Sequence, residues 1–163
     1  MMALTGSFRG NRQAMKNKHT VIRILLIEDE PDIQSFIHRV LELEGYDVLK
    51  TGDGQTGLEM VRKYPVSLVL LDLRVPGLDG WGVLREMKRD AELARIPVVV
   101  LTAVAETSQR RRTMSMGAAR YLIKPLSANG LSQTIADILN KKGSPIKTAP
   151  EKAPPFHEMN VGY

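Results

Sequence analysis

The sequence predicts an α/β fold, a doubly wound parallel sheet of five strands that carries five helices. Short apolar runs alternate with segments of helical periodicity between residues 19 and 142, which is the pattern of repeated strand and helix units. The run LVLL at residues 68–71 is apolar at every position, as in a strand that is covered on both faces. The connections between the segments are short, which favours helices packed on both faces of the sheet.

Each element has its own signals in the chain. Strands are predicted at residues 21–27, 46–51, 68–71, 96–101 and 119–123, where apolar runs end in polar or turn residues. Pro31 suits a first helical turn, Gly45 suits a helix end, and Asp79 and Ser127 are N-cap residues. Helices are therefore predicted from Pro31 to Gly45, at 54–63, from Asp79 to Arg89, at 106–116, and from Ser127 to near Gly143.

The helix at 106–116 differs from the others. Its only strongly apolar residues are Met114 and Met116, while residues 109–112 are polar or basic. A helix of this composition buries little apolar area, so we expect it to be held loosely.

Composition divides the chain into one domain with two tails. Residues 1–18 are predicted to be a disordered basic N-terminal tail, residues 19–142 the folded domain, and residues 143–163 a Pro-rich C-terminal tail, and the net charge of +5 is concentrated in these tails. The chain has no cysteine, which excludes disulfides and thiolate metal sites. It also lacks both a secretory signal and an apolar stretch of the roughly 20 residues that span a membrane. A cytoplasmic location is the default expectation.

Four strands end in residues that can do chemistry. Glu28 and Asp29 follow the first strand, Asp72 the third, Thr102 the fourth and Lys124 the fifth. Carboxyl ends of parallel strands meet at one edge of the sheet, and a flavodoxin-like order of 2-1-3-4-5 would set strands one and three side by side, about 4.8 Å apart. We therefore expect these side chains to converge.

Gathered carboxylates repel one another unless a cation lies among them. Oxygen ligands without His or Cys favour Mg²⁺, so Glu28, Asp29 and Asp72 are candidate magnesium ligands. Asp72 could then attack phosphorus with a free oxygen, while Lys124 and Thr102 stabilise charge on the phosphoryl group. Each residue alone has an ordinary explanation as a cap, turn or surface residue, and the functional interpretation depends on all of them together.

Residues 21–140 resemble the response-regulator receiver domain of two-component signalling. The resemblance rests on four motifs in order: LLIEDEP, LVLLDLRVPGLDG, VVVLTA and YLIKPL. It implies that Glu28 and Asp29 form the acidic pair, that Asp72 accepts a phosphoryl group from a histidine kinase or phosphotransfer protein, and that the backbone carbonyl of Arg74 completes the Mg²⁺ ligands.

The resemblance also implies a switch. Thr102 and Tyr121 would be its coupled pair, and the Lys124–Pro125 peptide bond would be cis, as is usual in the family. Too little chain follows Gly143 for a further domain, so the expectation is a stand-alone receiver with no direct DNA-binding domain and no membrane contact, unless the sequence is a fragment of a longer protein. Its output would pass through a downstream protein partner, with a homodimer as one option. It would not be an enzyme beyond self-catalysed phosphotransfer and autodephosphorylation.

Two alternatives remain at this point. One is a receiver-like scaffold that is never phosphorylated and acts through its basic tails, against which the intact set of site residues argues. The other is a phosphatase of the haloacid-dehalogenase type, which needs a second acid where Arg74 stands. A P-loop or dinucleotide site is excluded because no Gly-rich phosphate fingerprint follows any strand.

Overall fold

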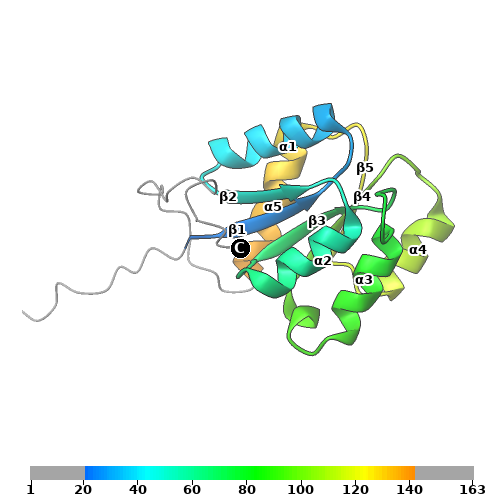
Figure 1. The fold of residues 1–163 in the computed structure, drawn as a ribbon. Coiled ribbons are helices and arrows are strands. Elements are labelled where there is room, and N and C mark those ends of the chain that lie inside the picture. Colours follow the sequence, from blue (N-terminus) through cyan, green and yellow to red (C-terminus); the bar gives the residue numbers. More distant parts are fainter. Residues whose placement is uncertain (1–20, 142–163) are drawn as a thin grey trace, which may run out of the picture.

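The predicted α/β fold is confirmed. The computed structural model describes residues 21–141, and the tails predicted at 1–18 and 143–163 lie outside the described residues. Five parallel strands form one sheet in the flavodoxin-like order β2-β1-β3-β4-β5 (Figure 1). The strands are β1 (Arg23–Ile27), β2 (Asp47–Thr51), β3 (Leu68–Asp72), β4 (Val98–Thr102) and β5 (Arg120–Ile123).

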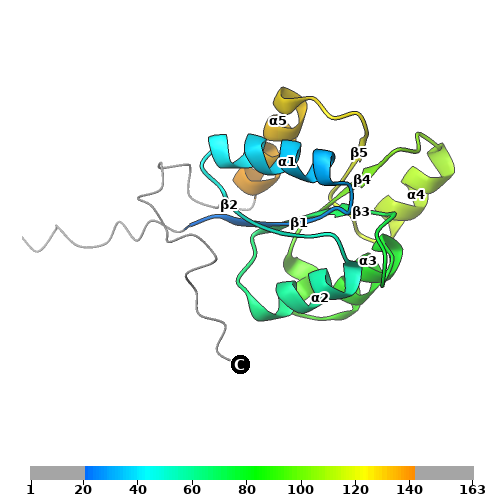
Figure 2. The same cartoon turned by 45° about the horizontal axis from the view of Figure 1, so that its top comes forward.

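Helices cover both faces of this sheet (Figure 2). They are α1 (Pro31–Leu43), α2 (Gly54–Lys63), α3 (Gly80–Arg89), α4 (Thr107–Ser115) and α5 (Ala128–Lys141), with one short 3-10 helix, η1 (Leu93–Arg95), that the sequence did not predict. The helices α1 and α5 pack on one face, and α2 and α3 pack on the other. Asp79 and Ser127 accept hydrogen bonds from the amides of Gly82 and Gly130, as expected of N-cap residues.

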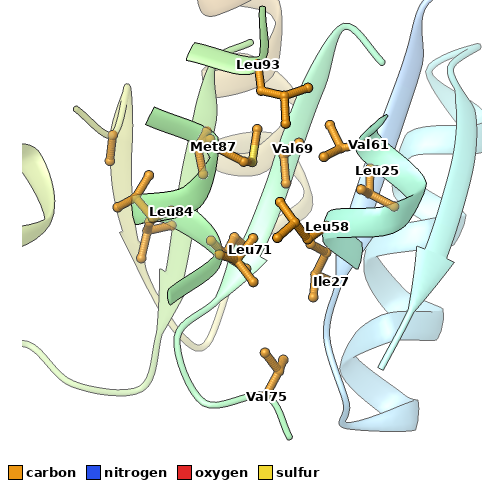
Figure 3. Packing of buried hydrophobic residues seen from close by; sticks show 14 of the residues in the cluster. Leu25, Ile27, Leu58, Val61, Val69, Leu71, Val75, Leu84, Met87 and Leu93 are labelled. Carbon is orange, nitrogen blue, oxygen red and sulfur yellow. The ribbon is translucent and has the colours of Figure 1, made fainter. Parts of the chain in front are cut away.

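The central strand β3 explains why its sequence is apolar throughout. All of its residues are buried, and alternate side chains point to opposite faces of a sheet. Leu68 and Leu70 therefore join the cluster under α1 and α5, whereas Val69 and Leu71 join the cluster under α2 and α3. Figure 3 shows this second cluster, in which Leu71 lies close to Leu58 of α2.

The strand boundaries differ slightly from the prediction. β4 begins at Val98 rather than Ile96, because Val98 is the first residue of β4 that pairs with β3. Thr102 and Asp72 are the last residues of their strands rather than the first residues beyond them, since Asp72 pairs with Leu101. β3 and β4 therefore include their functional residues, whereas Glu28 and Lys124 lie one residue beyond β1 and β5.

Helix α4 buries little, as its composition predicts. Thr113 is its one buried residue, and Met114 is 39% exposed. Met116, just beyond the helix, packs partly against the core. Within residues 21–141, no helix has the length and apolar character needed to cross a membrane.

Candidate functional site

The acidic cluster forms because β1 and β3 are parallel neighbours. Ile27 pairs with Leu71, so Glu28 leaves β1 beside Asp72 at the end of β3. Carboxylate oxygens of Glu28, Asp29 and Asp72 lie within 4.8 Å of one another. The convergence that the sequence predicted for these three carboxylates is confirmed.

The three carboxylates differ in their surroundings. Glu28 is fully buried and Asp72 is 4% exposed, whereas Asp29 is exposed to solvent. Burial raises the pKa of the Glu28 carboxyl, although its contacts with the Lys124 ammonium and the Glu30 amide act in the opposite direction. The exposed Asp29 leaves the cluster open on one side.

Lys124 brings its charge into the middle of this cluster. Its Nζ lies 2.6 Å from Asp72 Oδ2, 2.7 Å from Glu28 Oε2 and 3.5 Å from Glu30 Oε1. Burial lowers the pKa of the ammonium, but the hydrogen bonds with Asp72 and Glu28 outweigh this effect and leave the pKa of Lys124 above its ordinary value. Lys124 is therefore a partner of the carboxylates, and the peptide bond that follows it to Pro125 is cis, as expected.

Both carboxylate oxygens of Asp72 have partners. Oδ2 faces Lys124, and Oδ1 accepts a hydrogen bond from the backbone amide of Arg74 at 2.8 Å. The structure thus brings Arg74 to the site through its amide, and the role of its carbonyl as a metal ligand stays a prediction. Gly80 lies behind Asp72, where a Cβ atom would come within 2.4 Å of the Asp72 carbonyl oxygen. Glycine at this position lets the loop after β3 fold back against the strand.

Thr102 and Tyr121 are linked, but through a third residue. Thr102 is buried at the end of β4, and its hydroxyl accepts a hydrogen bond from the Val104 amide at 3.1 Å. The Tyr121 hydroxyl lies 2.7 Å from the Val104 carbonyl oxygen. Between the two hydroxyls lies the side-chain amide of Gln109 from α4, with Oε1 at 3.0 Å from Tyr121 and 3.5 Å from Thr102. Sequence reasoning missed Gln109, because a polar residue in a polar helix gives no signal.

The donor set suits a divalent cation. Three carboxylates carry more negative charge than the single ammonium of Lys124 balances, and two of them are buried. All three offer oxygen atoms, and one of them is open to solvent, which fits an ion that keeps several of its waters. The residues present therefore fit Mg²⁺.

Comparison with known proteins gives the family. A model of the response regulator receiver domain matches residues 24–136. The chain belongs to this family. This receiver domain is similar to that of the sensor histidine kinase PA1611 from Pseudomonas aeruginosa, with 30% identity and a TM-score of 0.69 over 74% of this chain and 99% of that one. That structure is described with a magnesium ion coordinated in its active-site cleft.

Curated relatives of the receiver domain are longer proteins. The chain is 34% identical over 119 residues to the probable transcriptional regulator ycf27 of Porphyridium aerugineum, covering 73% of this chain and 48% of that one. It is equally similar to the DNA-binding dual master transcriptional regulator RpaA of Synechocystis sp., covering 73% and 49% of the two chains. The receiver domain thus spans about half the length of the curated relatives it matches.

These relatives correct one expectation from the sequence. We expected a stand-alone receiver that signals only through protein partners and has no direct DNA-binding domain. The matching relatives contradict this expectation, because they are named as transcriptional regulators and one of them as DNA-binding. The error arose because the expectation was drawn from the residues after Gly143 alone.

Proposed function

We propose that the receiver domain is a phosphorylation-dependent switch in which Asp72 accepts a phosphoryl group from a histidine kinase or a phosphotransfer protein. The observation that carries this proposal is the convergence of the carboxylates of Glu28, Asp29 and Asp72 with the ammonium of Lys124. A carboxylate nucleophile, an acidic cluster and a fixed ammonium are what transfer of a phosphoryl group to an aspartate requires.

Glu28, Asp29 and Asp72 would hold Mg²⁺, with the Arg74 carbonyl as a further ligand. Bound there, the ion would neutralise carboxylate charge and the negative charge of the incoming phosphoryl oxygens. The backbone amide of Glu30 donates a hydrogen bond to Glu28 Oε1 at 3.1 Å and would help to orient the Glu28 carboxylate for this role.

The chemical step would take place at Asp72. A bond forms between an Asp72 oxygen and phosphorus while the bond between phosphorus and the donor's imidazole nitrogen breaks, and the imidazole leaves with the electron pair and takes a proton from solvent. Lys124, now 2.6 Å from Asp72 Oδ2, would pair with a phosphoryl oxygen, and the Thr102 hydroxyl would donate to another. The hydrogen bond from the backbone amide of Arg74 to Asp72 Oδ1 would keep the Asp72 carboxylate oriented during the attack.

Intact mass spectrometry tests the acceptor. The chain is incubated with Mg²⁺ and acetyl phosphate, and wild type is compared with Asp72→Asn. A single phosphoryl adduct on wild type and none on the variant is the expected result. An adduct on both proteins would mean that another residue is the acceptor, and an adduct on neither would favour a scaffold that is never phosphorylated.

We further propose, from the names of the relatives, that the output of the switch is control of transcription. The test compares transcript levels in cells that carry the wild-type gene or the Asp72→Asn allele. Unchanged transcripts under conditions in which wild type is phosphorylated would count against this output.

A further inference from the structure

The side chain of Gln109 spans the space between the site and the edge strand β5. Its Oε1 lies 3.0 Å from the Tyr121 hydroxyl and 3.5 Å from the Thr102 hydroxyl. The Gln109 backbone is fixed separately, because the buried Thr113 donates its hydroxyl hydrogen to the Gln109 carbonyl at 2.8 Å. Gln109 thus connects Thr102, Tyr121 and α4.

The number of hydrogens limits what this arrangement can do. Each hydroxyl carries one hydrogen, and a carbonyl or amide oxygen only accepts. The Tyr121 hydroxyl lies within hydrogen-bonding distance of two such oxygens, those of Val104 and Gln109. With its amide oxygen toward the hydroxyls, Gln109 takes the single hydrogen of Thr102. Thr102 then has none left to donate to a phosphoryl oxygen.

A half-turn of the amide changes this count. The nitrogen and oxygen of a glutamine amide have nearly the same shape, and the terminal torsion that exchanges them is soft. With the nitrogen inward, one amide hydrogen goes to Thr102 and the other to Tyr121, and Tyr121 donates to Val104. The Thr102 oxygen, the Tyr121 oxygen and the Val104 carbonyl oxygen then each accept a hydrogen bond, and the hydrogen of Thr102 is free.

We propose that Gln109 is a positioning residue that directs the Thr102 hydrogen. Its amide oxygen holds that hydrogen in the unphosphorylated chain, and its amide nitrogen releases it toward the phosphoryl group while keeping Tyr121 in contact with α4. The 3.5 Å separation from Thr102 is at the limit of a hydrogen bond, so the half-turn breaks only a weak bond to Thr102. The inference rests on the proposed function, since it assigns the freed hydrogen to a phosphoryl oxygen.

The first test needs no phosphorylation. The side-chain amide signals of Gln109 and Gln133 are followed by NMR in wild type, Thr102→Val and Tyr121→Phe. Both substitutions are expected to shift the Gln109 pair and leave the pair of Gln133, on α5, in place. If the side-chain amide signals of Gln109 keep their wild-type positions in both variants, Gln109 does not bridge the hydroxyls of Thr102 and Tyr121.

The second test compares acceptor and donor chemistry at residue 109. A carboxylate only accepts, so Gln109→Glu should hold the Thr102 hydrogen and slow phosphorylation by acetyl phosphate by about tenfold or more, the worth of one hydrogen bond to a charged group. Gln109→Leu can neither hold the Thr102 hydrogen nor donate to Thr102 and Tyr121, so its rate should lie between those of wild type and Gln109→Glu. Ser108→Ala, an exposed position on the same helix, is the matched control.

The Thr102→Val background separates this role from charge repulsion. Without the Thr102 hydroxyl, the additional effect of Gln109→Glu should fall below about twofold. Equal rates for the Gln109→Glu and Gln109→Leu variants, or an undiminished effect in the Thr102→Val background, would overturn the proposal. An unphosphorylated wild type would count against the proposed function instead, and the NMR comparison would still decide whether Gln109 bridges the two hydroxyls.

Discussion

Lys124 donates a hydrogen bond to Asp72 with Nζ 2.6 Å from Oδ2, although 52 positions separate the two residues in the chain. The same ammonium lies 2.7 Å from Glu28 Oε2. The loops that follow β1 and β5 and the end of β3 are therefore joined through one cation. Its charge stabilises two buried carboxylates that would otherwise repel each other.

Removing that cation should weaken the fold. In Lys124→Met, Glu28 and Asp72 remain buried without their partner, and loss of one member of a buried ion pair lowers the free energy of unfolding by about 3–5 kcal/mol. Urea unfolding without added metal measures this loss. Lys50→Met, at an exposed position of β2, is the control and should change the free energy of unfolding by less than about 0.5 kcal/mol. Equal stabilities of the two variants would show that Lys124 does not stabilise the cluster.

Magnesium should stabilise the folded chain through the same carboxylates. A ligand at about 100 times its Kd adds roughly 2.7 kcal/mol to the free energy of unfolding, and chelation with EDTA should reverse the gain. Asp29→Asn should lose most of it, because the exposed Asp29 oxygen belongs to the cluster. Asp32→Asn, at an exposed position in the first turn of α1, should keep it. A gain of equal size in both variants would place the ion elsewhere.

The sequence predicted the parts of the molecule that depend on local patterns. The apolar run from Leu68 to Leu71 gave a buried strand, and parallel pairing then brought Asp72 beside Glu28. Gln109 could not be predicted, because its contacts depend on how α4 lies over β4 and β5, and no local pattern determines the packing of a polar helix. That the matching relatives are named transcriptional regulators could not be predicted from the residues of this chain either, because the matched segment is only about half of their length.

A side chain at Gly54 should destabilise the folded chain, because Gly54 packs against the loop after β3. A Cβ there would lie 1.7 Å from the Leu78 carbonyl oxygen, so Gly54→Ala forces the loops after β2 and β3 apart. Overpacking of this kind destabilises by about 1–3 kcal/mol, even though alanine favours a helix more than glycine does. Gly52→Ala is a matched control, since its nearest contact would be 3.4 Å. A thermal melt in which both variants match wild type would contradict the collision.

Acid should remove the contribution of Asp90 to the free energy of unfolding. Its carboxylate accepts hydrogen bonds from the amides of Leu93 and Glu92, which hold the pKa of Asp90 below its ordinary value of 3.8. Between the folded pKa and pH 3.8, the folded state therefore binds fewer protons than the unfolded state. The stabilisation by Asp90 is thus present above pH 3.8 and is lost as the pH falls through the folded pKa. Asp90→Asn keeps an acceptor but does not titrate. Its urea midpoint should decline less steeply than that of wild type below about pH 4, and parallel curves would refute this assignment.

Helix α4 should open more readily than α1. Thr113 is the one buried residue of α4, and the Arg112 guanidinium, 4.4 Å from the Trp81 ring centroid, adds only a partly exposed contact. Helix α1 instead buries Ile37 and Leu41 completely. Because local opening is easiest where few apolar contacts must break, amide hydrogens of α4 should exchange at least about tenfold faster than those of α1. Hydrogen exchange with mass spectrometry measures both helices in one experiment.

Gln109→Leu should accelerate exchange in α4 while leaving α1 unchanged, because it removes the contacts of α4 with Thr102 and Tyr121. Equal protection of the two helices in wild type would mean that these polar contacts hold α4 as firmly as an apolar core holds α1.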